Sequence, residues 1–199
     1  GYRWGTSTFL GSSRTDAAEF SGFRDVTDVT TGFAMACALR ANGTVWCWGR
    51  NDKGQVGDGA WDYEALAPVQ VPGLDDAVAI DAGSAHVCAV RRGGTVWCWG
   101  SNVNAQLGHG TTDFSRHGLP EQVGTDVQRI TDAGAIDAGA QSTCVIRRTG
   151  AVACWGAGSM VQLLQPNPVL SGRPIYDVPL IDDAVEIASD NPTCVLRSS

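Results

Sequence analysis

The stretch GTVWCWGRNDKGQVGDG at residues 43–59 indicates a repeated fold, because nearly the same sequence returns as GTVWCWGSNVNAQLGHG at residues 94–110. Each copy places a cysteine between two tryptophans and then runs into a polar loop rich in glycine. A redox centre, a metal site and a repeated structural unit would each account for such a segment. The flanking sequence distinguishes the three.

The flanking sequence is an internal repeat. Its best-preserved part is CALRANGTVWCWG at residues 37–49, which returns as CAVRRGGTVWCWG at 88–100 and as CVIRRTGAVACWG at 144–156. A fourth copy begins with CVLRSS at residues 194–199. A single unit of such a repeat cannot bury its own apolar face, so neighbouring units must stack. The chain is therefore expected to form one stacked array.

The two ends of the chain fit one further repeat that is split between them. Trp4-Gly5 matches the position that Trp48-Gly49 holds in the first complete repeat. This match favours a closed ring, although a longer array cut at the same phase would have the same ends. The single repeat domain, residues 1–199, is expected to divide into a closing part at 1–27, repeats at 28–77, 78–128 and 129–180, and the start of the split repeat at 181–199.

Each repeat is expected to consist of β-strands. In the segment TVWCW, strand alternation turns Cys47 to one face and both Trp46 and Trp48 to the other. If Cys37 faces Cys47 across a hairpin, the turn between the two strands has three residues and ends in a glycine. The same construction fits the other two repeats, and a glycine in this turn position is typical of three-residue hairpins.

Cysteines that face each other across a hairpin are candidates for disulfides. Three bonds within repeats would place the chain in an oxidising compartment. The alternative is that these cysteines stay reduced and pack as small apolar side chains. Cys194 has no partner in this scheme and is either unpaired or bonded to another chain. The predicted structural pairs are Cys37 with Cys47, Cys88 with Cys98, and Cys144 with Cys154.

The segments WGRNDKGQVGDG and WGSNVNAQLGHG resemble the signature of the regulator of chromosome condensation repeat. The resemblance implies an all-β fold, a β-propeller of four-stranded blades. Family members commonly have seven blades, whereas this chain has about four repeats. It would therefore be a compact ring with its last blade shared between the termini, a part of a larger propeller, or a half-ring completed by association. Cysteines in every repeat favour a secreted, bacterial-type member.

The composition limits the classes of function. A net charge of −7 and a pI near 4.8 argue against nucleic-acid binding, which needs a basic surface to neutralise phosphates. An acidic surface also disfavours docking on anionic membranes, and no apolar run is long enough to insert in one. No motif of a catalytic triad, zinc protease or carboxylate pair is apparent, so we expect no catalytic residue, no metal and no cofactor.

The expected function is that of a non-enzymatic secreted propeller that binds a protein partner or self-associates through its loops. The expected location is extracellular or at the cell surface, with the periplasm as a further possibility. Two alternatives stay open from the resemblance and the aromatic content: a guanine nucleotide exchange factor or chromatin-type regulator, and a glycan-binding, lectin-like propeller.

Two groups of side chains are the candidates for blade packing and for partner binding. The recurring tryptophans are expected to seal one blade against the next, with a sugar-binding ladder as the alternative; they are Trp46, Trp48, Trp97, Trp99 and Trp155. The loops that depart from the repeat carry aromatic and arginine side chains typical of interface anchors, with blade-edge packing as the alternative. These partner-binding candidates are Trp61, Tyr63, Phe114, Arg116 and His117.

The segment HGTTDFSRH at residues 109–117 raises the question of a metal site, because it holds two histidines and Asp113. A metal site is not expected here, because no histidine recurs with the repeat and the cysteines lack the short spacing of a zinc knuckle. His86 is expected to be a structural residue of its repeat.

Overall fold

The computed structural model describes residues 2–3, 18–19, 23–60, 62–125, 128–157, 175–189 and 193–198. All of the regular structure in these ranges is β-strand, in agreement with the predicted all-β fold. The described residues contain no helix long and apolar enough to cross a membrane. Trp61, a predicted partner contact, and Trp4-Gly5 lie outside the described residues.

Three antiparallel sheets of four strands form the blades, and in each the strands pair in chain order. Blade 1 consists of β3 (Val26–Gly32), β4 (Met35–Arg40), β5 (Val45–Arg50) and β6 (Glu64–Gln70). Blade 2 consists of β7 (Ala77–Ala82), β8 (His86–Arg91), β9 (Val96–Ser101) and β10 (Arg116–Gln122). Blade 3 consists of β13 (Ala133–Ala138), β14 (Ser142–Arg147), β15 (Val152–Gly156) and β16 (Tyr176–Asp177).

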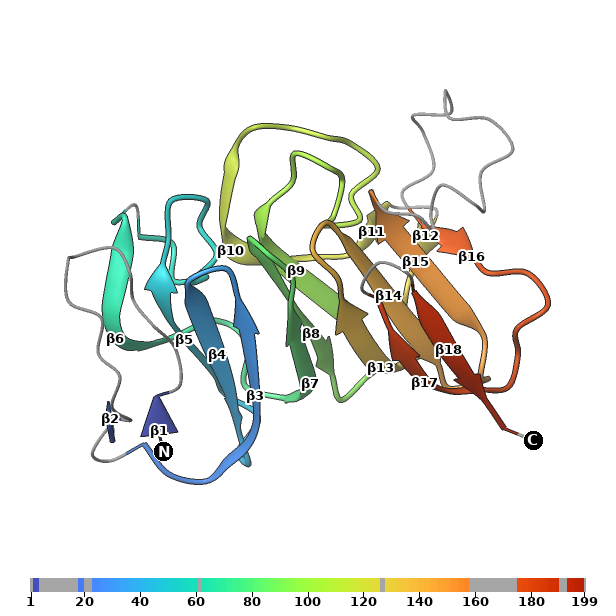
Figure 1. Ribbon diagram of the computed structural model, residues 1–199, viewed down its shortest axis with the longest axis horizontal. Coiled ribbons are helices and arrows are strands. Elements are labelled where there is room, and N and C mark those ends of the chain that lie inside the picture. The colour runs from blue at the N-terminus through green and yellow to red at the C-terminus, as the bar shows by residue number, and fades with distance from the viewer. Residues whose placement is uncertain are drawn as a thin grey trace.

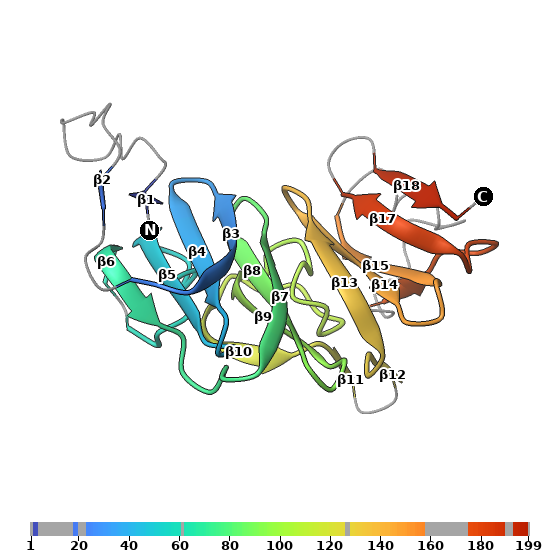
Figure 2. The ribbon, with the colours of Figure 1, turned by 90° about the horizontal axis from the view of Figure 1, so that it is seen from below.

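Three two-stranded sheets complete the described structure. They are β1 (Tyr2–Arg3) with β2 (Ala18–Glu19), β11 (Gly124–Thr125) with β12 (Gln128–Arg129), and β17 (Ala184–Ala188) with β18 (Cys194–Arg197). The blades stand side by side, and β3, β7, β13 and β17 follow one another along the inner edge (Figures 1 and 2).

Among the described residues, the strands near the two termini do not pair with each other, as sharing of one blade between the termini would require. β1 pairs with β2 and β17 pairs with β18, and these two pairs lie at opposite ends of an open array (Figure 1). The matching sequences at the two ends indicate only that the chain begins and ends at the same point of the repeat. The terminal strands form their hydrogen bonds with neighbouring strands in the sequence, so the two ends do not have to meet. The described structure is therefore an arc of propeller blades.

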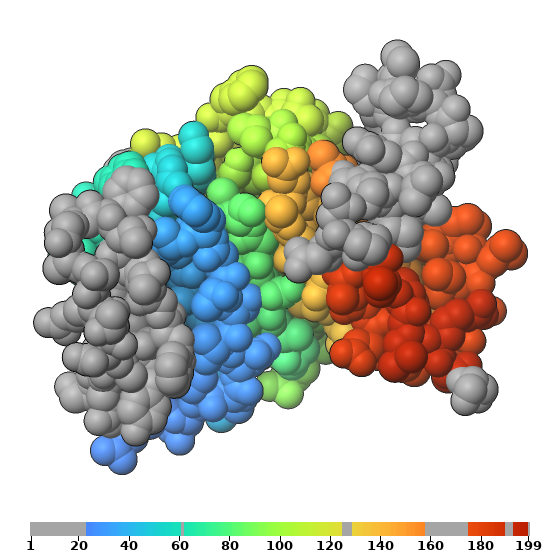
Figure 3. Space-filling model, in the orientation of Figure 1, coloured from blue at the N-terminus to red at the C-terminus, as the bar shows by residue number. Residues whose placement is uncertain are grey.

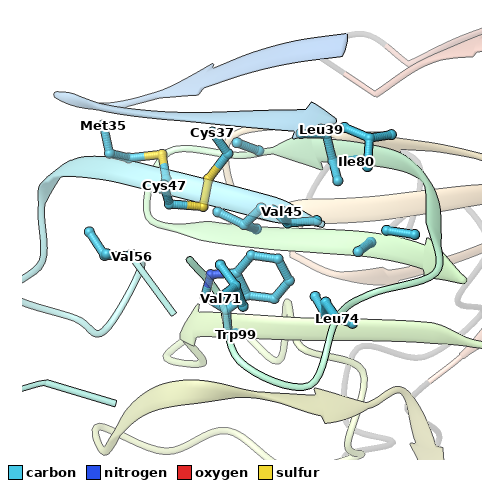
Figure 4. Close-up of a cluster of buried hydrophobic side chains, with 14 residues drawn as sticks. Met35, Cys37, Leu39, Val45, Cys47, Val56, Val71, Leu74, Ile80 and Trp99 are labelled. Atoms are coloured by element: carbon cyan, nitrogen blue, oxygen red, sulfur yellow. A yellow bond between two sulfur atoms is a disulfide. The ribbon is translucent and has the colours of Figure 1, made fainter. Parts of the chain in front are cut away.

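The packing between blades is directional. The Cys37–Cys47 disulfide and Val45 line one face of blade 1, and Trp99 of β9 packs against this face from blade 2 (Figure 4). The Trp99 indole N–H also donates a hydrogen bond of 3.0 Å to the carbonyl oxygen of Gln55. Blade 1 thus turns its disulfide face to the tryptophan face of blade 2.

Blades 2 and 3 repeat the same contact. Trp155 of β15 packs against the face of blade 2 that carries the Cys88–Cys98 disulfide, and its indole N–H donates to the carbonyl oxygen of Gln106 at 2.7 Å. The third predicted disulfide, Cys144–Cys154, lies in a cluster with β17.

The remaining predicted cysteine and tryptophans are more accessible. Cys194 is a free, exposed thiol. Trp46 and Trp97 are half-buried, and the guanidinium of Arg91 lies over the Trp97 ring at 5.5 Å. Trp48 is buried and meets the ring of Phe23 edge to face, so the tryptophan face of blade 1 is covered by the chain that enters the blade.

The hairpin turns have the predicted geometry and also join the blades. Gly43, Gly94 and Gly150 close the turns with φ angles of +84°, +89° and +86°. The carbonyl oxygen of each glycine accepts a hydrogen bond of 3.0 Å from the first residue of the next blade's inner strand, for example from Ala77 to Gly43. A Cβ on Gly94 would lie 2.6 Å from the carbonyl oxygen of Thr131, so both the backbone angle and the close approach require glycine here.

Two neighbouring glycines in one turn test this requirement. We expect Gly94→Ala to lower the free energy of unfolding by about 2–4 kcal/mol, because it strains the backbone and pushes blade 3 away. Gly93→Ala is the matched control, because Gly93 has an ordinary backbone angle and a Cβ added to it would have nothing within 4 Å. It should change the free energy of unfolding by less than about 0.5 kcal/mol in urea titrations of the oxidised protein. Equal losses in the two variants would contradict this role for Gly94.

Candidate functional site

One edge of the array carries the long connections between the third and fourth strands of each blade. The β5–β6 and β9–β10 connections both leave this edge, at the top of Figure 1, together with the β3–β4 and β7–β8 turns. We call this edge the loop face. The β9–β10 connection projects from it in the space-filling view (Figure 3).

The loop face is built on internally bonded loops. The buried side chain of Asn51 accepts a hydrogen bond of 3.0 Å from the amide of Val56, and Asn102 accepts one of 3.2 Å from Leu107 in the next blade. The Gln55 side chain accepts a hydrogen bond of 2.7 Å from the amide of Lys53. Because these amides are satisfied within the loop, the Gly-rich segments act as rigid turns and not as a phosphate cradle.

The predicted partner-binding side chains differ in how far they are exposed. The Phe114 side chain is 90% exposed, Tyr63 is 50% exposed, and Arg116 is exposed at the start of β10. Phe33 is a further exposed aromatic on the loop face that sequence reasoning missed, and the Arg50 guanidinium lies over its ring at 5.5 Å. Phe33 lies in the short turn after β3, and no sequence pattern around it predicts that its side chain is exposed.

His117 is a different kind of residue from the other predicted contacts, because its ring is only 16% exposed. Its Nε2 lies 2.9 Å from an oxygen of Asp113, and its Nδ1 lies 2.8 Å from an oxygen of Glu121. His109 joins the group, with its Nδ1 at 3.5 Å from the other oxygen of Glu121. We call His109, Asp113, His117 and Glu121 the histidine–carboxylate cluster.

A bulge in β10 assembles this cluster. His117 pairs with Gly100 and Glu121 pairs with Cys98, so four steps along β10 correspond to two steps along β9. In a regular strand, residues four apart would be about 13 Å from each other. The bulge brings the two side chains into contact, and this is why the sequence spacing alone did not connect Glu121 with the histidines.

The charges in the cluster depend on each other. Burial opposes protonation of His117, but its hydrogen bonds to Glu121 and Asp113 outweigh that effect and raise its pKa. Burial lowers the pKa of His109, although the Glu121 carboxylate acts in the other direction. Burial also acts to raise the pKa of Asp113, but hydrogen bonds from Asn102, His117 and Ser115 outweigh it and lower that pKa. Asp113 is therefore a carboxylate that holds His117 in place.

His86 has a structural setting, as the sequence predicts for it. The ring is fully buried between blades 2 and 3, where Nε2 lies 2.8 Å from the Thr143 hydroxyl. Gly83 packs against the ring so closely that a Cβ there would overlap His86 Cε1. Burial lowers the pKa of His86 to about 4, so the imidazole is neutral at physiological pH.

The blades are four-stranded meanders that stack through a repeated tryptophan contact and carry their long loops on one edge. These features define a domain of the β-propeller class. The sequence profile of the regulator of chromosome condensation (RCC1) repeat matches residues 42–90 and 93–146, and a second profile of the same repeat matches residues 26–55 and 77–106. The chain belongs to the RCC1 repeat family.

Relatives and solved structures agree with this assignment. The human E3 ubiquitin-protein ligase HERC2 is 29% identical over 144 residues, which is 70% of this chain and 3% of HERC2. The mouse regulator of chromosome condensation is 29% identical over 161 residues, or 79% of this chain and 37% of the mouse protein. Human WBSCR16 superimposes with a TM-score of 0.70 at 18% identity, over 87% of this chain and 45% of WBSCR16. The chain spans less than half the length of each of these proteins.

Buried His86 predicts a specific dependence of stability on pH. Its pKa is depressed in the folded state, so the unfolded chain takes up a proton first as the pH falls below 6.5. Folded-state stability should therefore drop by about 3 kcal/mol between that pH and about pH 4. His86→Met removes the titrating group, and Met35 holds the equivalent position in blade 1, opposite Gly49 as His86 is opposite Gly100.

The measurement is urea unfolding of both proteins at several pH values. The difference in stability between His86→Met and the parent should grow in favour of the variant as the pH falls. Parallel losses in the two proteins would show that His86 contributes nothing to the acid sensitivity.

Proposed function

We propose that this chain is a non-enzymatic protein-binding module whose loop face takes a protein partner, and that it works in an oxidising compartment, outside the cell or in the periplasm. The observation that carries the proposal is Phe114, a large apolar side chain that is 90% exposed above an internally bonded loop.

Exposed aromatics on a rigid base are well suited to binding a protein. Phe33, Tyr63 and Phe114 all lie on the loop face, in two neighbouring blades, and each is at least half exposed. Aromatic side chains dominate the binding energy of protein interfaces, and little conformational entropy is lost when they already stand on an ordered support. Arg116 on β10 adds a side chain of the type enriched at such interfaces.

Proteins with the same fold bind proteins. The yeast RCC1 protein Prp20 has been solved bound to Kap60, and Prp20p of Saccharomyces cerevisiae has binding properties to Gsp1p and histones. Their likeness to this chain, at 18% and 17% identity, supports the propeller as a binding scaffold and does not identify the partner.

The disulfides support the oxidising compartment. Each of the three blades carries one, and the six bonded cysteines are almost completely buried. Bonds of this kind form and persist where the redox poise is oxidising, and they are rare in the cytosol. An intracellular exchange factor or chromatin-type regulator would have to keep these cysteines reduced.

The glycan-binding alternative receives no support from the three buried tryptophans of the repeat. Trp99 and Trp155 are completely buried between blades, and Trp48 is 5% exposed. A sugar-stacking ladder needs open ring faces, and these three rings are used for blade packing.

The test compares two equally exposed apolar side chains at opposite edges of the array. Phe114→Ala should reduce capture of the partner from secreted or periplasmic fractions of the source cells by tenfold or more, on the order expected for an interface anchor. Leu180→Ala is the control, because Leu180 is 92% exposed in the β16–β17 connection, away from the loop face. It should leave capture unchanged.

Two outcomes would contradict the proposal. If Phe114→Ala and Leu180→Ala behave alike, then the loop face does not bind the partner. If alkylation of native material, denatured without reductant, labels all seven cysteines instead of Cys194 alone, then the disulfides and the oxidising compartment are wrong.

A further inference from the structure

We propose that His109, His117 and Glu121 form a binding site for a divalent transition metal ion of the zinc type on blade 2. One ligand atom from each of the three residues lies within 4.8 Å of the others. Two imidazoles and a carboxylate are a common ligand set for zinc, with the fourth position left to water or to a group from a partner. This inference is independent of the proposed protein binding.

The distances suit a tetrahedral ion after a small adjustment. Bonds of 2.0–2.1 Å from zinc place neighbouring ligand atoms about 3.3 Å apart. The Nδ1 atom of His117 is 2.8 Å from one oxygen of Glu121, and the Nδ1 atom of His109 is 3.5 Å from the other. The two Nδ1 atoms therefore already face the same carboxylate, which would move only slightly to admit an ion.

The side chains that would orient a metal-binding His117 are already in place. Ionised Asp113 can only accept hydrogen bonds, so the Nε2 atom of His117, 2.9 Å away, must carry the proton. The Nδ1 atom of His117 faces the Glu121 carboxylate at 2.8 Å, and a metal ion would replace the proton that lies between these two atoms. Asp113 is itself fixed by the buried side chain of Asn102 at 2.8 Å and by the amide of Ser115 at 2.9 Å. A carboxylate that orients a histidine in this way is the usual support of a metal-ligating histidine.

Charge also favours a divalent cation. Once metal binding has displaced the Nδ1 proton of His117, two neutral histidines with the carboxylates of Glu121 and Asp113 carry two negative charges, which one divalent ion would neutralise.

Blade 1 shows that the fold does not need these side chains. β6 has the same bulge as β10, with Ala65 opposite Gly49 and Val69 opposite Cys47. Ala65 and Val69 thus occupy the positions that His117 and Glu121 hold in blade 2. An identical bulge without a histidine or a carboxylate implies that the cluster in blade 2 has a role beyond shaping the strand.

The same comparison supplies variants that should fold. His117→Ala and Glu121→Val place the residues of blade 1 at the equivalent positions of blade 2. Asp113→Asn keeps the size of the supporting side chain but removes its charge. His86→Met is the matched control, because it removes a histidine that lies outside the cluster. All variants are made with Cys194→Ser, so that the free thiol cannot bind the metal.

The experiment is titration of the oxidised chain with Zn²⁺ by calorimetry, with excess Mg²⁺ present to occupy acidic surface groups, and with Co²⁺ absorption as a report of the coordination geometry. One Zn²⁺ per chain should bind, and Co²⁺ should give the visible spectrum of a tetrahedral site with nitrogen and oxygen ligands. Asp113→Asn should weaken binding by about 10–100-fold. His117→Ala and Glu121→Val should weaken it at least as much, and His86→Met should not change it.

Two results would overturn the proposal. One is the absence of saturable Zn²⁺ binding by the correctly folded parent. The other is Zn²⁺ binding that persists at the parental affinity in His117→Ala and Glu121→Val. Either would mean that the cluster is an ion-pair network without a metal. Circular dichroism of each variant distinguishes loss of the metal site from loss of the fold. Capture of the protein partner by the loop face is measured in a separate experiment.

Discussion

Blades 1 and 2 each present their disulfide face to the tryptophan face of the following blade, and this contact fixes how the blades stack. Trp99 buries its ring on blade 1 and binds the backbone of the loop at Gln55, and Trp155 does the same to blade 2 at Gln106. The contact gives the array a direction, because the two faces of a blade are chemically different. It also explains why the cysteine and the tryptophans alternate along one strand.

The loop face follows from the same contact. The indole N–H holds the carbonyl oxygen in the middle of each Gly-rich loop, while the buried asparagine and glutamine satisfy the loop amides. A loop fixed at its base can carry exposed groups such as Phe114 without losing its shape. Blade 2 uses the same frame to bring His117 and Glu121 together through the β10 bulge, whereas blade 1 has the frame and the bulge without the chemistry.

The hairpins, the disulfide pairing and the separation of cysteine and tryptophan faces could be predicted from the sequence, because they depend on residue spacing within one repeat. Whether the blades close into a ring could not be predicted, because the sequences at the two ends match the repeat equally well in an open array and in a closed ring. The histidine–carboxylate cluster could not be predicted either. It depends on two extra residues in a bulge, which change the distance between His117 and Glu121 without changing their spacing in the sequence. Exposure of Phe33 depends on where neighbouring blades end, which no local pattern reports.

The most direct test of the blade contact is the exchange of the tryptophan indole hydrogens with deuterium, followed by NMR with assignments from single Trp→Phe variants. The indole N–H groups of Trp99 and Trp155 are completely buried and hydrogen-bonded to the preceding blade. We predict that their signals persist long after those of surface amides have exchanged. Exchange of these two signals at the rate of an unfolded chain would contradict the packing of disulfide face on tryptophan face.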